Sequence, residues 1–167
     1  RVWAVLSPPR YAGLPPKELP EGDANIEALV GTKASLTINS SKPLEGVWAV
    51  FTSGDTVEGT TDDHEGALSF HVRRSGSYAL RLLGEQGYYN RDPIEYQISA
   101  MPDEFPSVAI VEPGEDRDLG NDFVVELIIE AADDYGFTRL ALIYKGPGGF
   151  ESTLEVPFTK TDRRHMG

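Results

Sequence analysis

Apolar and polar residues alternate with a period of two along most of the first hundred positions of this chain. In residues 33–40, Ala34, Leu36 and Ile38 alternate with small polar side chains. This period is typical of a β-strand with one buried face. Residues 46–53 are apolar on both faces, which predicts a strand in the interior of a sheet. The same reasoning predicts strands over residues 67–74, 77–84 and 94–100, with weaker candidates at 1–6 and 25–30.

Short clusters of Gly, Asp and Ser separate these segments, as expected for turns between strands. Residues 123–134 could be forced into a helical pattern, but their Val and Ile content favours a strand. No other segment has a convincing helical period. About seven strands within roughly a hundred residues is the content of an immunoglobulin-like β-sandwich. The sequence therefore predicts an all-β fold.

A proline-containing and acidic stretch at residues 100–107 has no period, as expected of a linker. We therefore expect two tandem immunoglobulin-like β-sandwich domains, residues 1–102 and 103–167. Only four strands are predicted in the second domain, where a sandwich needs about seven. We expect this domain to be incomplete, with edge strands that are exposed or covered by a neighbour. Its predicted strands are residues 107–113, 123–134, 137–146 and 150–158.

The chain is acidic, with a formal net charge of −12. Residues 1–102 carry 13 acidic and 9 basic side chains, a net of −4, and residues 103–167 carry 14 and 6, a net of −8. An acidic chain repels phosphate backbones, so we expect no nucleic-acid partner. No apolar run approaches the ~20 residues that span a bilayer, so we expect no direct membrane contact by this segment. Cysteine is absent, which does not settle the compartment.

No pattern of catalytic residues stands out. His64 lies in an acidic turn, His71 falls on an outward strand face, and His165 lies in the polar C-terminal tail. No serine has the context of a nucleophile elbow, and no spacing pairs two carboxylates in a pocket. We therefore expect no enzyme activity and no catalytic residue in this chain.

Calcium is the one cofactor that the sequence raises. Acidic side chains cluster in residues 112–122 and again in 132–136, and calcium takes six to eight oxygen ligands. The spacing matches no EF-hand loop, so acidic loops that simply stay in water are the alternative. The candidate ligands are Asp116, Asp118, Asp122, Asp133 and Asp134.

Adjacent tyrosines, Tyr88 and Tyr89, lie in the loop of residues 84–93. Exposed loop aromatics often bind ligands, so these two are candidate contacts for a carbohydrate or a peptide, with Trp3 and Trp48 as further aromatics. The alternative is that one tyrosine packs over the end of the sandwich and the other is ordinary surface. Tyr78, by contrast, resembles the tyrosine corner of immunoglobulin-like domains, whose hydroxyl bonds to nearby backbone.

Residues 7–16 read SPPRYAGLPP. Such a run could be a polyproline ligand, or it could end a strand. We favour the second interpretation: Pro8 and Pro9 end the first strand, and Tyr11 and Leu14 turn inward to cap the sandwich.

Two stretches together resemble a known family. They are residues 7–44, with the PPxYxGLPP start and the later ALVGT and SKPL, and residues 128–144, with AxDDYG. The family consists of large, uncharacterised bacterial proteins that carry transmembrane helices, then immunoglobulin-like repeats, then coiled-coil and low-complexity regions. The resemblance implies an extracytoplasmic setting, in the periplasm or at the cell surface, and a parent anchored in the inner membrane. It implies no catalytic residue. The chain starts with Arg1 rather than Met, and we expect it to be a piece of such a parent.

The main hypothesis is therefore a non-enzymatic module of a bacterial envelope protein, acting as a spacer or a protein-interaction segment. Its expected partners are other segments or domains of the parent chain. The alternatives are a calcium- or glycan-binding sandwich, or an accessory domain of a larger enzyme.

Overall fold

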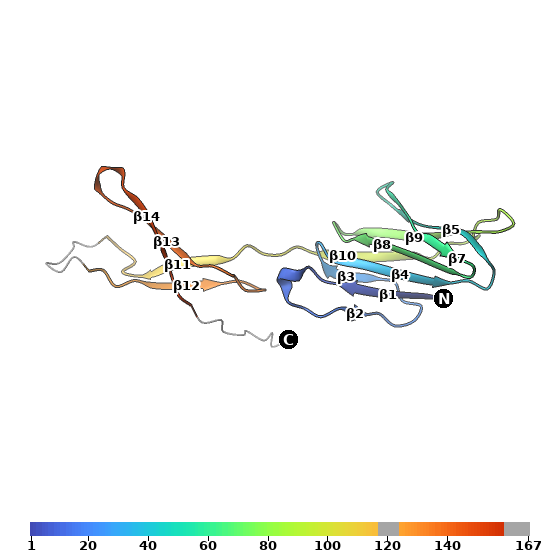
Figure 1. Cartoon of the computed structure of the whole chain (residues 1–167), viewed down its shortest axis with the longest axis horizontal. Helices are drawn as coiled ribbons and strands as arrows, with labels where there is room; N and C mark the ends of the chain where they lie inside the picture. Colours follow the sequence, from blue (N-terminus) through green and yellow to red (C-terminus); the bar gives the residue numbers. More distant parts are fainter. Residues whose placement is uncertain (117–123, 159–167) are drawn as a thin grey trace. The chain divides into compact units, whose positions relative to one another are not determined.

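The structure is a computed structural model that describes residues 1–116 and 124–158. The chain divides into two compact units, Arg1–Asp103 and Glu104–Gly167. The described residues contain strands and two short 3₁₀ turns but no α-helix, which confirms the all-β prediction (Figure 1). No helix in the described part is long and apolar enough to cross a membrane.

The first unit consists of two five-stranded sheets, shown in Figure 1. The first sheet has the order β2-β1-β4-β8-β7: Lys17–Glu18, Val2–Ser7, Lys33–Asn39, Glu65–His71 and Thr60–Asp62. The second sheet has the order β3-β10-β9-β5-β6: Ile26–Leu29, Glu95–Met101, Gly76–Gly84, Leu44–Phe51 and Thr56–Glu58. Neighbouring strands are antiparallel except for β3 and β10, which run parallel.

The alternating residues of both sheets form one core. In β4, Ala34, Leu36 and Ile38 are buried while the residues between them are partly or fully exposed, as the sequence predicts. Aromatic rings fill the centre: Phe51 meets Phe70 edge to face, with ring centroids 5.0 Å apart. Edge-to-face contacts of this kind add to the stabilisation from burial alone. The cluster also contains Tyr78, Tyr96, Val47 and Val72.

The proline-rich stretch comes where the chain leaves β1, before it passes from the first sheet to the second. β1 ends at Ser7 directly before Pro8, as predicted, because proline cannot donate a ladder hydrogen bond. A 3₁₀ turn, η1 (Arg10–Ala12), follows, and the chain returns along β1 as β2. β3 then joins the opposite sheet.

The prediction that Tyr11 and Leu14 turn inward is wrong. Tyr11 is 55% exposed and Leu14 is 50% exposed, whereas Ala12 between them is buried. The physical reason is the short η1 turn, which directs its small residue into the unit and its larger neighbours outward. Gly13 follows the turn in the left-handed conformation, which glycine adopts without steric cost.

A second switch between the sheets occurs at Gly59. β6 pairs with β5, and β7, which follows one residue later, pairs with β8. Gly59 lies in the narrow passage between them, where a Cβ atom would come within 2.3 Å of the Ala67 carbonyl oxygen. Only a residue without a side chain can therefore make this crossing. The sequence pattern did not predict either three-residue strand.

The described part of the second unit contains two separate antiparallel pairs. β11 (Ser107–Glu112) pairs with β12 (Ile128–Ala132), and β13 (Ala141–Lys145) pairs with β14 (Glu151–Glu155). These are the four strands expected from the sequence. None of the buried core residues lies in the described part of this unit, and many of its large apolar side chains are exposed. They include Val108, Ile110, Val111, Val124, Val125, Ile128, Ile143, Tyr144, Phe150 and Leu154.

Candidate functional site

The loop of residues 84–93, which carries Tyr88 and Tyr89 and which we call the tyrosine loop, forms one wall of a groove at one end of the first unit. The other wall is the connection from β4 to β5, residues 40–44. The hollow between the two walls has a volume of about 590 Å³, which is within the usual range of ligand sites. We call it the tyrosine groove; residues 40–44 and residues 82, 84–86 and 88–90 line it.

Asn90 holds the tyrosine loop against β9. Its Oδ1 accepts a 2.9 Å hydrogen bond from the Leu82 N–H, and its Nδ2 donates a 2.8 Å bond to the Leu80 carbonyl. The Asn90 N–H also donates to the Leu82 carbonyl at 3.1 Å. β10 pairs with β9 only up to Ala79, so Asn90 occupies part of the edge that β10 leaves uncovered. Asn90 thereby fixes one end of the loop.

A tight turn closes the loop on its other side. The Gly87 N–H donates to the Gly84 carbonyl at 2.9 Å, and the Gly84 N–H donates to the Tyr88 carbonyl at 3.0 Å. Gly87 has φ of +74°, which favours glycine at this position. The loop is therefore hydrogen-bonded at both ends, and the two tyrosines are presented from a fixed backbone.

Tyr89 lies over the outer face of the second sheet. Its ring centroid is 6.3 Å from that of Trp48, and the Arg81 guanidinium lies 5.0 Å from it. Trp48 and Arg81 are direct cross-strand partners on β5 and β9. Trp48 in turn lies on Gly46, where a Cβ atom would meet the indole ring at 2.1 Å. The glycine therefore allows the indole to lie close to the sheet and support Tyr89.

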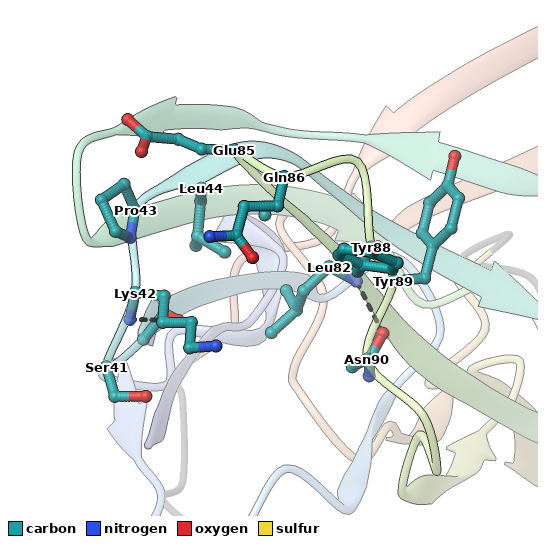
Figure 2. A pocket seen from close by; sticks show the side chains of 12 residues that line it. Ser41, Lys42, Pro43, Leu44, Leu82, Glu85, Gln86, Tyr88, Tyr89 and Asn90 are labelled. Atoms are coloured by element: carbon teal, nitrogen blue, oxygen red, sulfur yellow. Dashed lines mark hydrogen bonds between the residues drawn. The ribbon is translucent and has the colours of Figure 1, made fainter.

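Tyr88 differs from its neighbour. It is 75% exposed, against 53% for Tyr89, and its ring contacts no other aromatic ring among the residues that the structure describes. Because adjacent residues of extended backbone point to opposite sides, one tyrosine is anchored on the sheet while the other is left available. Figure 2 shows the two rings pointing in different directions, with Leu82 at the base of the groove.

The groove offers hydrogen-bonding groups, an apolar base and one charge of each sign. Lys42 and Glu85 are both exposed on its walls. The apolar surface comes from Pro43, Leu44 and Leu82. The Lys42 N–H donates to the Ser40 hydroxyl at 3.2 Å, which orders the first wall. These groups can hold a partner by stacking, apolar contact and hydrogen bonds.

The five candidate calcium ligands lie in the second unit. Asp118 and Asp122 are outside the described residues. Asp133 accepts a 3.1 Å hydrogen bond from the Tyr135 N–H, so its carboxylate belongs to a local turn. Among the described residues, no three acidic or histidine side chains come together in a way that could hold a metal ion. Because two candidates fall outside this part, the calcium site stays a prediction.

Sequence reasoning identified the two tyrosines but missed their supports. Gly46 precedes Trp48 by two residues on a strand, which is the spacing at which a large ring can lie over a glycine. Asn90 follows the tyrosines directly, but nothing in the sequence distinguishes its role from that of an ordinary loop asparagine. The opposite wall, residues 40–44, approaches the loop only through the fold.

No protein-family model matches the chain, and neither a curated protein nor a solved structure matches it.

Proposed function

We propose that the chain is a non-enzymatic protein-interaction module that binds a segment of another polypeptide in the tyrosine groove. The observation that carries this proposal is Tyr88, which is 75% exposed on a loop that Asn90 fixes in place. A loop backbone that is already fixed before binding loses less entropy when a partner docks on the aromatic side chain that it presents. Tyrosine is also among the residues that contribute most binding energy in protein interfaces.

The composition of the groove favours a polypeptide partner. Serine, asparagine and tyrosine dominate antibody binding loops, because they combine adaptable hydrogen bonds with rigid aromatic contacts. The groove has Ser40, Ser41, Tyr88, Tyr89 and Asn90. A glycan platform would need a flat row of rings, and the planes of Trp48 and Tyr89 are tilted by 54°. We therefore place a peptide before a glycan as the occupant.

The strand order supports an immunoglobulin-like assignment for the first unit. Such sandwiches place four strands in one sheet and the remainder in the other, joined by crossovers between the sheets. In this unit β1, β4, β8 and β7 are neighbours in one sheet, and β10, β9 and β5 are neighbours in the other. The tyrosine groove then lies at one end of the sandwich, where immunoglobulin-like domains carry their binding loops.

The proposed setting is outside the cytoplasmic membrane, in the periplasm or at the cell surface of a bacterium, within a parent anchored in the inner membrane. Its support is the resemblance carried by residues 7–44 and 128–144. Fusion of the full-length parent to alkaline phosphatase, which is active only after export, tests this setting. An inactive fusion that is present in normal amount would contradict it.

The second unit supports an additional partner. Its four strands form two unconnected pairs, and its apolar side chains are exposed in the described part. Unpaired strand edges readily accept further strands. We propose that this unit is a partial sandwich which other segments of the parent protein complete.

The groove is tested by selection from a random twelve-residue peptide library displayed on phage, with the whole chain as the target. Enriched peptides are then synthesised, and their affinities are measured for the unchanged chain and for Tyr88→Ala. We expect Tyr88→Ala to weaken binding by about thirtyfold or more, which corresponds to the loss of at least about 2 kcal/mol that defines an interface hot spot. Tyr11→Ala is the matched control. Tyr11 is 55% exposed and lies after β1, at the end of the first sheet that is away from the tyrosine groove. Failure to enrich any peptide, or equal affinity for Tyr88→Ala, would overturn the proposal.

A further inference from the structure

β8 has a neighbouring strand along only half of one edge. On one side it pairs with β4 over its whole length, from Glu65 to His71. On the other side β7 reaches only from Glu65 to Ala67. Residues 68–71 therefore have no neighbouring strand on that side among the residues that the structure describes. We call residues 68–71 the open edge of β8.

The open edge presents two backbone donor and acceptor pairs. The N–H and the carbonyl of Val72 both bond toward the β4 side, to Thr32 and Gly31 respectively. Because the direction of these groups alternates along an antiparallel strand, those of Ser69 and His71 point toward the open edge. Both residues are exposed. An extended chain could therefore pair with β8 here, in line with β7.

A hollow of about 620 Å³ lies beside the open edge, between residues 51–57 of the β5–β6 hairpin and residues 70–74 at the end of β8. Its apolar lining comes from both sheets: Phe51 and Val57 on one, Phe70 and Val72 on the other. A strand added beside β8 would direct alternate side chains toward this lining. Valine or a side chain of similar size suits such a position.

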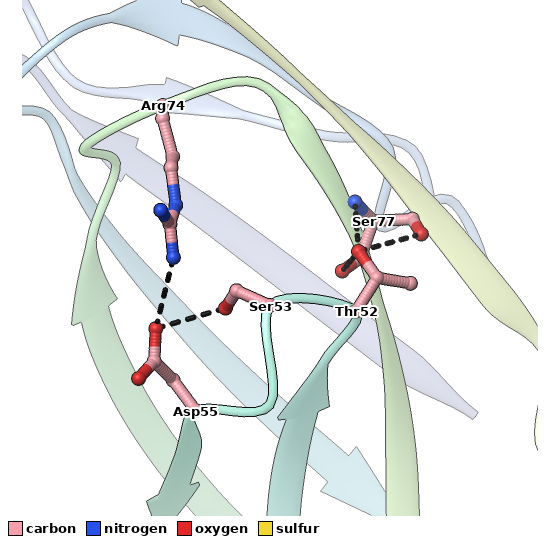
Figure 3. A network of polar contacts seen from close by, with 5 residues as sticks. All are labelled: Thr52, Ser53, Asp55, Arg74 and Ser77. Atoms are coloured by element: carbon pink, nitrogen blue, oxygen red, sulfur yellow. Dashed lines mark hydrogen bonds and ion pairs between the residues drawn. The ribbon is translucent and has the colours of Figure 1, made fainter.

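The rim of the hollow is basic, although the chain as a whole is acidic. Arg73 and Arg74 are both exposed at the end of β8, and Asp55 is the only acidic residue that lines the hollow. Arg74 contacts Asp55 at 3.2 Å, and the Ser53 hydroxyl donates to the same carboxylate oxygen at 2.8 Å (Figure 3). Arg73 has no ion pair among the described residues. One cationic group at the rim is thus unneutralised.

We propose that the open edge of β8 accepts an extended acidic and apolar peptide segment as an added strand. Its backbone pairs with Ser69 and His71, its apolar side chains enter the hollow, and its carboxylates meet Arg73. This is recognition by β-strand addition, in which main-chain bonds give affinity and side-chain pockets give specificity. The site is at a different place from the tyrosine groove and depends on none of its residues.

The probe is an acetylated and amidated octapeptide, EVTVTVEE, mixed with the whole chain. Two control peptides are matched to it. KVTVTVKK reverses the charge. The second is EVTVTVEE with N-methyl groups on the alternate residues that face β8, which cannot donate hydrogen bonds to that strand. Binding is followed by fluorescence polarisation and by the amide NMR signals of the chain. We expect EVTVTVEE to bind at least about fivefold more tightly than KVTVTVKK, as charge complementarity at a solvent-exposed rim allows. The Ser69 and His71 amides should become protected from exchange, and the N-methylated peptide should not bind.

Two protein variants separate the contributions. Arg73→Glu should abolish the preference for EVTVTVEE, and Arg91→Glu, an exposed arginine in the tyrosine loop, should keep it. Ser69→Pro removes one N–H from the open edge, where the ladder with β4 does not need it, and should weaken binding about tenfold. Equal affinity for the two charged peptides would overturn the proposal, and so would signal changes confined to the tyrosine groove. Doubling of the solution mass with loss of peptide binding would also overturn it, because a second copy would then occupy the edge.

Discussion

The hydroxyl of Tyr78 donates a 2.7 Å hydrogen bond to the carbonyl oxygen of Ala24, which lies 54 residues earlier in the chain. Both residues are completely buried. The bond joins β9 to the segment that enters β3, across the intervening β10. The prediction of a tyrosine corner bonded to nearby backbone is therefore wrong about the partner. The bond instead fixes the segment that leads into β3 of the second sheet.

Replacement of Tyr78 by phenylalanine should lower the free energy of unfolding by about 1–2 kcal/mol. The ring would keep its packing, but the Ala24 carbonyl would lose its buried partner. Tyr96→Phe is the matched control, since no hydrogen bond of the Tyr96 hydroxyl is present among the described residues. Urea unfolding measures both variants. An equal loss in both would show that the bond to Ala24 contributes nothing specific.

Stability should fall at alkaline pH because of the same tyrosine. Burial, followed by the neighbouring Tyr96 and Asp23, raises the pKa of Tyr78 well above its usual range. Burial and Asp23 also raise the pKa of Tyr96. Tyrosine in an unfolded chain ionises at about pH 10. Below that pH the full contribution to stability is present, and above it only the unfolded state loses the proton.

The free energy of unfolding should therefore decrease above about pH 10, by up to about 1.4 kcal/mol per pH unit for each such tyrosine. Urea titrations between pH 8 and pH 11.5 measure this slope. Tyr78→Phe should show a shallower decrease, because it removes the group with the most strongly raised pKa. A slope identical to that of the unchanged chain would contradict this origin.

Gly59→Ala should destabilise the first unit by about 3 kcal/mol, at the upper end of the cost of overpacking. The new Cβ would lie 2.3 Å from the Ala67 carbonyl oxygen and 2.7 Å from the Leu68 Cβ, and backbone cannot move aside as a flexible side chain can. The matched control is Gly76→Ala, where the nearest atom is the Thr52 Oγ1 at 3.7 Å. Thermal unfolding should show a large loss for the first variant and a change within about 0.5 kcal/mol for the second.

The second unit should not behave as an independent, fully protected domain. Its exposed apolar residues and its two unconnected strand pairs should leave backbone amides open to exchange, or lead to association through the strand edges. Light scattering measures the solution mass, and hydrogen exchange measures protection over β11 to β14. A strictly monomeric chain with full protection of these strands would contradict the partial sandwich.

Features that depend on neighbouring residues in the sequence were predictable, whereas features that depend on contacts between distant segments were not. Period-two alternation predicted the long strands, because a strand with one buried face has an apolar residue at every second position. It missed β6 and β7, since three residues are too few to show a period. The inward direction predicted for Tyr11 from the surrounding prolines was wrong, because the direction of a loop side chain is set by the turn and not by its own polarity. In the candidate site the sequence could identify Tyr88 as an exposed aromatic, but the hold of Asn90 on β9 appears only once the strands are paired.

Gly46→Ala tests whether the sheet face supports the tyrosine groove. The added Cβ would come within 2.1 Å of the Trp48 indole, which must then move away from the sheet. Because Tyr89 packs on Trp48, the tyrosine loop should lose one of its supports. In a Trp3→Phe background Trp48 is the only tryptophan, and its emission should shift to longer wavelength. Peptides that bind the tyrosine groove should weaken in the same variant, while thermal stability should change by only about 1 kcal/mol because the displaced ring lies at the surface. An unchanged emission would show that the indole does not lie against Gly46, and unchanged peptide affinity would show that Trp48 does not help to position Tyr88.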